Sequence, residues 1–186
     1  ALPIYSAHAE APRTANPAQA RAISAIAAAS PGQCLLLWGV TGAGKTEVYL
    51  QSAALELAAG RSVLLLAPEI GLIPQLVDRC RARFGADVME YHSGMGTAER
   101  VAAWRRVLQA GADGTPLVAV GTRSAIFLPM ASLGLIVLDE EHDSSYKQES
   151  PMPCYHAREV ARLRASRQGD RKSTRLNSSH LVISYA

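Results

Sequence analysis

The sequence lacks three features that would point to a secreted or membrane-bound protein. Its only cysteines, Cys34, Cys80 and Cys154, are odd in number, lie far apart and form no C-x-x-C pair. We therefore expect a reducing cytoplasmic setting, with neither a disulfide framework nor a zinc site made within this segment. No apolar run approaches the ~20 residues that a membrane-spanning helix needs. The N-terminus also lacks the basic-then-apolar pattern of a secretory signal, so no membrane partner is expected.

The chain also lacks a strong excess of one charge. Its net charge is +3, and the residues from 170 to 186 contribute +2 of that through Arg171, Lys172 and Arg175 against Asp170. Nucleic-acid binding would have to depend on local patches rather than on overall charge. With 186 residues, 48% of them hydrophobic, and a mean hydropathy of +0.05, the chain fits one globular α/β domain.

What the sequence does contain is a phosphate-binding loop. An apolar run at residues 35–38 leads into Gly39–Thr46, which fits G-x-x-x-x-G-K-[ST]. Glycines allow backbone N–H groups to converge on an anion, and the following helix adds the positive end of its dipole. We expect Lys45 to reach the β- and γ-phosphates and the Thr46 hydroxyl to bind Mg²⁺. The predicted nucleotide-binding loop consists of Gly39, Val40, Thr41, Gly42, Ala43, Gly44, Lys45 and Thr46.

Strand-like and helix-like segments alternate along the chain, which predicts a mostly parallel, doubly wound sheet. The expected strands are residues 34–38, 62–67, 88–91, 117–120 and 135–138. The expected helices begin after Asn16, after the phosphate loop, near Leu72, at a Thr97 cap and near His156. In the Thr97 helix, Val101, Trp104 and Leu108 are expected to face the core. The 34–38 segment is expected to be a core strand.

A second chemical motif follows the last predicted strand. Asp139 comes directly after four apolar residues, and Glu140 follows it. Ligands of open α/β sheets bind at the carboxyl ends of the strands, and the phosphate loop leaves its own strand at that same edge. We therefore expect Asp139 to hold Mg²⁺ and Glu140 to orient and deprotonate the attacking water.

These two motifs and several others carry a specific resemblance. Gly39–Thr46 and the run from Asp139 to His142 resemble motifs I and II of superfamily 2 helicases. The longer set resembles the primosomal protein N′ (PriA) family of bacterial replication-restart helicases over about residues 14–169. Its motifs are residues 67–75, 91–94, 121–127, 139–148 and 155–158. The implied fold is a RecA-like P-loop NTPase domain, truncated at its C-terminal end.

The resemblance implies an ATP-dependent 3′-to-5′ DNA helicase that acts on single-stranded and branched DNA. Single-strand-binding protein and primosome proteins are the implied partners, and ATP and Mg²⁺ the cofactors. Gln19 would read adenine, or would only complete a helix capping box with Asn16. His142 would link the ATP site to the DNA-facing side, or would be a structural histidine. The implied DNA contacts are Pro68, Glu69, Gly71, Thr122, Arg123, Ser124, Tyr146 and Lys147.

Two of the implied DNA contacts, Arg123 and Tyr146, need separate comment. Arg123 would contact DNA phosphates or pair with a core carboxylate. The loop from Asp143 to Tyr155 resembles an aromatic-rich DNA-sensing loop, but Met152, Pro153 and Cys154 stand where another aromatic residue is expected. Base stacking by Tyr146 therefore has little support from neighbouring aromatic residues.

The expected division of the chain is an extended lead-in at residues 1–15, the helicase ATP-binding domain at 16–169 and a tail at 170–186. The tail resembles translated vector sequence, so we predict that it is not native. Its apolar, β-branched run at residues 181–185 is able to occupy an empty strand position. The family's second RecA-like domain and its zinc module are expected to lie outside this segment.

Three other functions are compatible with a phosphate loop. A different superfamily 2 translocase is disfavoured by the motifs at residues 139–148 and 155–158. A P-loop kinase would need a basic lid segment, which the sequence does not offer. The third alternative is an inactive, truncated module that binds nucleotide or DNA without turnover.

Overall fold

A computed structural model describes residues 13–30, 32–39, 42–85, 88–169 and 180–185. The helices are α1 (Pro17–Ala27), α2 (Lys45–Ala58), α3 (Ile73–Phe84), α4 (Thr97–Asp113) and α5 (Ala157–Gly169). The strands are β1 (Cys34–Trp38), β2 (Ser62–Leu66), β3 (Met89–Tyr91), β4 (Val118–Gly121), β5 (Leu133–Leu138), β6 (Lys147–Gln148), β7 (Tyr155–His156) and β8 (His180–Tyr185). Short 3₁₀ turns are η1 (Ile70–Leu72), η2 (Arg123–Phe127) and η3 (Ser144–Tyr146). Among the described residues, no helix is long and apolar enough to span a membrane.

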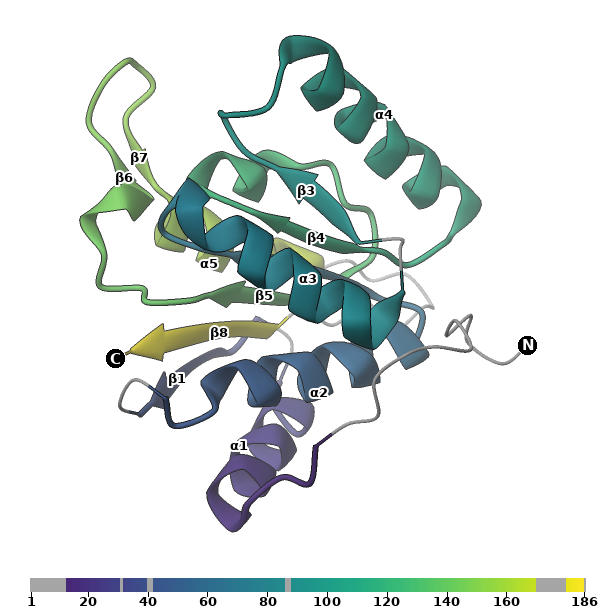
Figure 1. Ribbon diagram of the computed structural model, residues 1–186, viewed down its shortest axis with the longest axis vertical. Helices are drawn as coiled ribbons and strands as arrows, with labels where there is room; N and C mark the ends of the chain where they lie inside the picture. The colour runs from purple at the N-terminus through teal and green to yellow at the C-terminus, as the bar shows by residue number, and fades with distance from the viewer. Residues whose placement is uncertain (1–12, 31, 40–41, 86–87, 170–179, 186) are drawn as a thin grey trace.

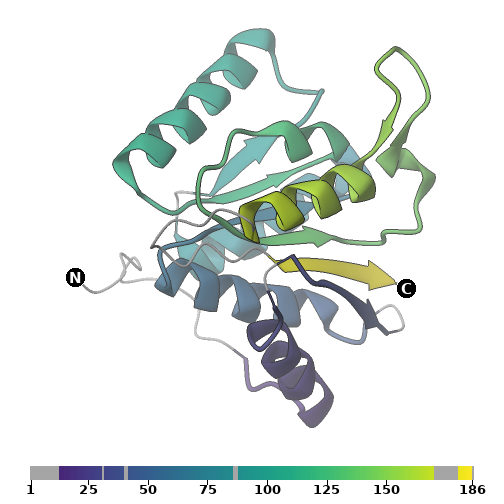
Figure 2. The ribbon, with the colours of Figure 1, turned by 180° about the vertical axis from the view of Figure 1, so that it is seen from behind.

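Six strands form one sheet in the order β1-β8-β5-β2-β4-β3, and every pairing in it is parallel. Helices α2 and α3 lie in front of this sheet in Figure 1, and α5 lies on its other face, toward the viewer in Figure 2. The predicted doubly wound parallel sheet is therefore confirmed. The small β6–β7 hairpin is antiparallel and stands apart from the sheet.

Alternation along the buried strands divides the core between the two faces. In β2, Leu64 and Leu66 belong to the cluster that includes the buried residues of α4 and α5. Val63 and Leu65 belong to the cluster beneath α2 and α3. The strand is buried on both faces because helices cover both, which is why its sequence reads as a continuous apolar run.

The C-terminal strand β8 lies between β1 and β5. Figure 1 shows it in yellow in that position. The prediction that the apolar run of the tail is able to fill an empty strand position agrees with this pairing. The strand brings the C-terminal ends of β1 and β5 into one continuous edge, where the phosphate loop and Asp139 begin.

The predicted inward face of α4 is wrong. Val101, Trp104 and Leu108 are 44%, 36% and 49% exposed, and the buried residues of this helix are Ala103 and Val107. The helix lies against the short edge strand β3, where small side chains allow close packing, and the larger apolar side chains face outward.

Three further details of the prediction need correction. The α4 N-cap is Gly96, whose N–H donates to Glu99 Oε2 at 2.7 Å, so Thr97 is the first helical residue. Strand β1 is the first strand in the sheet order and is therefore an edge strand rather than a core strand. At this edge Leu36 is 59% and Trp38 72% exposed. In α3, Leu72 lies before the helix and is exposed.

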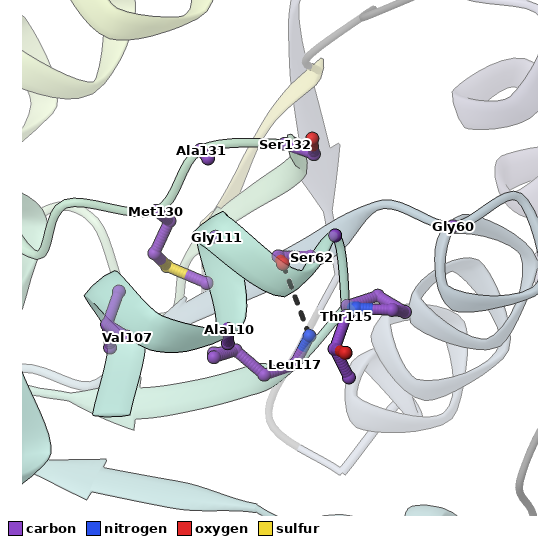
Figure 3. A pocket seen from close by; sticks show the side chains of 12 residues that line it. Gly60, Ser62, Val107, Ala110, Gly111, Thr115, Leu117, Met130, Ala131 and Ser132 are labelled. Atoms are coloured by element: carbon purple, nitrogen blue, oxygen red, sulfur yellow. Dashed lines mark hydrogen bonds between the residues drawn. The ribbon is translucent and has the colours of Figure 1, made fainter. Parts of the chain in front are cut away.

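The opposite, N-terminal edge of the sheet is closed. There the backbone N–H of Leu117 donates to Ser62 Oγ at 3.2 Å, as Figure 3 shows. The cavity at this edge, lined by residues including Val107 and Met130, has a volume of about 10 Å³. Since one water needs about 10–15 Å³, this cavity is not a ligand site.

Candidate functional site

The phosphate loop has the backbone that anion binding requires. Gly42 and Gly44 have φ angles of +82° and +78°, in the left-handed region that favours glycine. Gly44 is the N-cap of α2, so the helix begins at Lys45 and directs the first N–H groups of α2 toward the loop. Val40 and Thr41, which were also predicted to bind nucleotide, lie outside the described residues.

Lys45 and the acidic motif face one another. The Nζ atom of Lys45 donates to the Gly39 carbonyl oxygen at 2.8 Å and lies 3.6 Å from Glu140 Oε1. The Lys45 side chain is only 10% exposed. Its charge is therefore held in place at the mouth of the loop, next to the carboxylate predicted to act as the base.

Asp139 is held at the end of β5 from two sides. Its N–H donates to the Leu66 carbonyl at 2.9 Å, and its Oδ1 accepts from the Tyr49 hydroxyl of α2 at 3.2 Å. Glu140 has a φ of +50°, which costs a non-glycine residue about 1–3 kcal/mol and is typical of functional sites. His142 Nδ1 lies 3.8 Å from Glu140 Oε2, so His142 is next to the acidic pair.

Lys45, Asp139 and Glu140 line one open pocket of about 420 Å³ at the carboxyl edge of the sheet, whereas His142 lies outside its lining. Its lining residues are Arg13, Gly42, Gly44, Lys45, Thr46, Glu47, Leu50, Arg79, Arg83, Asp139 and Glu140. Protein-bound Mg²⁺ is held by one or two side-chain oxygens together with substrate phosphates and water. The Thr46 hydroxyl and the Asp139 carboxylate fit that donor set. No group of three or more His, Cys, Asp and Glu side chains suited to a metal occurs among the described residues.

Gln19 contacts the phosphate loop and completes the helix cap at the same time. Its Oε1 accepts from the Asn16 N–H at 2.9 Å, and Asn16 Oδ1 accepts from the Gln19 N–H at 2.9 Å. Its Nε2 donates to the Gly44 carbonyl at 3.2 Å. The capping box is therefore present, and the other end of the same amide contacts the loop that was predicted to bind nucleotide.

The pocket has a basic wall that the sequence analysis did not identify. Arg83 of α3 is 7% exposed, and its Nη2 donates to both carboxylate oxygens of Glu47 at 3.1 Å. Its Nε and Nη1 atoms are buried and have no hydrogen-bond partner among the described residues. No sequence motif marks Arg83, because its distance from the phosphate loop depends on how α3 packs beside α2.

A second pocket, of about 350 Å³, contains part of the predicted DNA-contact set. Its lining residues are Pro68, Ile70, Ser93, Arg100, Thr122, Arg123, Ser124, Ser145 and Gln148. Gly121 is the last residue of β4 and directly precedes Thr122. A side chain at Gly121 would overlap the Tyr91 carbonyl oxygen. The absence of that side chain lets β3 and β4 approach closely at this edge. Glu69 and Gly71 are exposed in the turn between β2 and α3 and do not line this pocket.

Arg123 forms its hydrogen bonds with carbonyl and amide oxygens, and it pairs with no core carboxylate among the described residues. Its Nη1 donates to the carbonyls of Ser145 at 3.0 Å and Lys147 at 2.7 Å, and its Nη2 donates to Gln148 Oε1 at 3.2 Å. The guanidinium also lies 5.8 Å from the centre of the Tyr155 ring. Arg123 therefore braces the loop that follows the acidic motif.

The assignment of Tyr146 as a DNA contact is wrong. Tyr146 is fully buried, and its hydroxyl lies 2.8 Å from the Leu66 carbonyl oxygen and 2.7 Å from that of Asp139. Burial, with the Asp139 carboxylate nearby, raises the pKa of Tyr146 well above its ordinary value, so the hydroxyl remains a donor. Lys147 is exposed, and its Nζ lies 2.6 Å from Glu149 Oε1.

The acidic motif has one further anchor. Glu141 is 4% exposed and forms an ion pair with Arg158 at the start of α5. The carboxylate is therefore satisfied inside the protein rather than available for chemistry. This pair ties the motif at residues 155–158 to the motif at 139–148.

Comparison with known proteins identifies the class first. The DEAD/DEAH box helicase family matches residues 16–169, which is more than half of the chain. The chain therefore belongs to the DEAD/DEAH box helicase family.

Individual relatives then specify the resemblance. The chain is 53% identical over 150 residues to the replication restart protein PriA of Synechocystis sp., covering 81% of this chain and 18% of that protein. It is 52% identical over 130 residues to PriA of Bacillus subtilis, covering 70% of this chain and 16% of that protein. The resemblance to PriA is confirmed, and the chain spans less than a fifth of the length of these relatives.

Solved structures bear on the fold alone. RecG bound to a three-way DNA junction matches with a TM-score of 0.62 at 21% identity, over 94% of this chain and 21% of that chain. The UvsW helicase of bacteriophage T4 matches with a TM-score of 0.58 at 16% identity, over 98% of this chain and 56% of that chain. Both support the RecA-like assignment of the sheet and its helices.

Proposed function

We propose that this chain is the ATP-binding domain of a 3′-to-5′ DNA helicase that restarts stalled replication forks. The observation that carries the proposal is the position of Lys45, Asp139 and Glu140 on one pocket. Lys45 and the two carboxylates come from opposite ends of the motif set, and an arrangement on separate edges of the sheet would have excluded a motor. High identity to PriA proteins over most of the chain supports the restart function.

Each residue of the pocket has a proposed role. The Lys45 ammonium compensates the charge of the β- and γ-phosphates, and the N–H groups of residues 42–46 bind the same anion. Thr46 and Asp139 hold Mg²⁺, which when bound adds positive charge at the reacting phosphate. Glu140 orients the attacking water and accepts its proton, and the Lys45 ammonium lies 3.6 Å from its carboxylate. His142 contacts Glu140 from the DNA-facing side and links the two sites.

The partners and boundaries are proposals as well. Single-stranded and branched DNA would bind beside the second pocket, with single-strand-binding protein and primosome proteins as partners, in the cytoplasm. We assign the helicase domain to residues 16–169, the lead-in to 1–15 and a non-native tail to 170–186. A second RecA-like domain would supply the opposite wall of the ATP site, so the isolated chain is expected to bind nucleotide weakly and to hydrolyse it poorly.

The test uses a full-length helicase that carries this domain. Lys45→Ala is expected to reduce DNA-stimulated ATP hydrolysis at least a hundredfold and to abolish unwinding of 3′-tailed duplexes. Arg21→Ala, an exposed change on α1 outside the pocket, is the matched control and should behave like wild type. Unwinding that persists in Lys45→Ala, or that prefers 5′-tailed duplexes, would contradict the proposal.

A further inference from the structure

The second pocket has the composition of an anion site. Two of its lining residues, Arg100 and Arg123, are cationic, and none of them carries a carboxylate. The remaining polar groups are hydroxyls and an amide, which are typical contacts of nucleic-acid phosphates. Exposed Ile70, also in the lining, adds an apolar contact of the kind that a sugar or base would cover.

Three of the five N–H donors of Arg123 are already used within the protein. Its two terminal nitrogens already donate to three oxygens of residues 145–148, at 2.7 to 3.2 Å. Moving this guanidinium to a phosphate would release the loop that it braces. The other basic residue of the lining, Arg100, donates no side-chain hydrogen bond to any described residue, which makes it the cation with more donors left for a ligand.

Arg100 is already oriented and still has binding capacity. Its guanidinium lies over the Tyr91 ring, 5.5 Å from the ring centre, which limits the directions in which it points. Its Nε is buried and has no hydrogen-bond partner among the described residues. The Ser124 hydroxyl, across the same lining, is buried and unpartnered in the same way. The Ser145 hydroxyl of the same lining is a third such atom. Buried polar atoms without partners are rare in native proteins, so three in one lining point to a ligand that binds here.

The rim beside Arg100 is also fixed in place. His92 is 8% exposed, its Nδ1 accepts from the Gly94 N–H at 3.1 Å, and its Nε2 donates to Glu90 Oε1 at 2.7 Å. This holds the turn that carries Ser93 into the lining and leads to the start of α4. The position of Arg100, in the first turn of α4, is therefore set by the fold and not by a flexible loop.

We infer that Arg100 of α4, together with Ser124, binds one phosphodiester group of the DNA strand, while Arg123 acts as a positioning residue for the loop. This inference rests on the proposed function, and it assigns to α4 a DNA contact that the motif analysis did not include. The ligand is a DNA backbone phosphate, so the contact adds affinity without sequence preference.

The experiment measures binding of a single-stranded oligonucleotide to the full-length helicase by fluorescence anisotropy across a salt series. Arg100→Gln is expected to weaken binding about tenfold, as loss of one charge-assisted hydrogen bond predicts. The salt slope should fall by about 0.7, the value for one single-strand phosphate. Arg105 is an exposed arginine of the same helix outside the pocket, so Arg105→Gln is the matched control. It should change the affinity by no more than about twofold and leave the salt slope unchanged.

A second arm replaces single phosphates of the oligonucleotide by neutral methylphosphonates, one position at a time. One position should weaken wild-type binding about tenfold and leave Arg100→Gln binding unchanged. Arg100→Lys, which keeps the charge without Nε, should keep the salt slope and guards against a folding defect in Arg100→Gln.

The outcomes separate the inference from the function on which it rests. If wild type binds DNA and Arg100→Gln matches Arg105→Gln, the inference is wrong and the helicase proposal stands. If no neutral linkage removes the difference between wild type and Arg100→Gln, the ligand is not a DNA phosphate and the inference is also wrong. If the wild-type protein shows no DNA binding and no DNA-stimulated ATP hydrolysis, the proposed function fails.

Discussion

The hydroxyl oxygen of Tyr146 lies 2.7 Å from the backbone carbonyl oxygen of Asp139. The residue before Tyr146 in the chain is Ser145, and its backbone carbonyl accepts a hydrogen bond from Arg123. A residue proposed to hold Mg²⁺ and a residue lining the second pocket are therefore joined through one short segment. Any movement of that segment on DNA binding would reach the backbone of Asp139 directly.

Tyr146→Phe removes the hydroxyl and keeps the ring. We expect the free energy of unfolding to fall by about 1 kcal/mol, because the Asp139 carbonyl loses a buried hydrogen bond. The ratio of DNA-stimulated to basal ATP hydrolysis should fall as well, since the link to Asp139 is lost. Tyr155→Phe is the control, because the Tyr155 hydroxyl makes no hydrogen bond with any described residue. Wild-type stability and stimulation in Tyr146→Phe would contradict this role.

Arg83 and Glu47 form an ion pair at the proposed ATP pocket, with side chains only 8% and 12% exposed. Arg83→Met alone should lower the free energy of unfolding by about 3 kcal/mol, because it leaves the Glu47 carboxylate buried without a counter-charge. The double variant Arg83→Met/Glu47→Met should recover part of that loss. Denaturant unfolding of the two single variants and the double variant measures the coupling. Strictly additive losses would mean that the pair contributes nothing as a pair.

Helix α4 offers two valines for one matched substitution. Val107 is 1% exposed and Val101 is 44% exposed. Val107→Ala should cost about 1.5 kcal/mol, the value for two buried carbon atoms, whereas Val101→Ala should stay within about 0.5 kcal/mol. Thermal and denaturant unfolding of both variants tests which face of the helix packs on the core. A larger loss in Val101→Ala would support the original assignment of this face.

Cys80 differs from the other two cysteines in burial. Burial raises the pKa of Cys80 from 9.0 to about 12, whereas Cys34 and Cys154 are exposed. Iodoacetamide reacts with the thiolate, so at pH 8 it should modify Cys154 in the folded protein and leave Cys80 unmodified. Mass spectrometry of the digested protein measures this, with a sample unfolded in guanidinium as the positive control. Rapid modification of Cys80 in the folded chain would mean that α3 does not pack as described.

The same pKa shift predicts a pH dependence. The unfolded chain releases the Cys80 proton above about pH 9, and the folded chain keeps it up to about pH 12. The contribution of Cys80 to stability is therefore complete below pH 9 and is lost as the pH rises toward 12. Cys80→Ala should remove that part of the decline, which is at most ~1.4 kcal/mol per pH unit. Parallel declines in wild type and Cys80→Ala between pH 9 and 11 would contradict it.

Local sequence was sufficient to predict the main helices and strands and to predict which residues meet at the proposed ATP site. Asn16, Pro17 and Gln19 specify the start of α1 through contacts within four residues, and the capping box forms as predicted. The phosphate loop and the Asp139–Glu140 pair were predicted to meet because parallel strands share one carboxyl edge. Each of these inferences depends on short-range geometry or on a rule of topology.

Distant packing decided the rest, and no local pattern encodes it. The hydrophobicity of α4 placed Trp104 inward, but the helix turned Ala103 and Val107 toward the sheet. Tyr146 was expected to face DNA, and the carbonyls of Leu66 and Asp139 drew its hydroxyl into the interior. Arg83 and Arg100 became lining residues of two pockets only because α3 and α4 lie beside strands far away in the sequence. A residue's type fixes which contacts it is able to make, and the three-dimensional neighbours determine which of those contacts it makes.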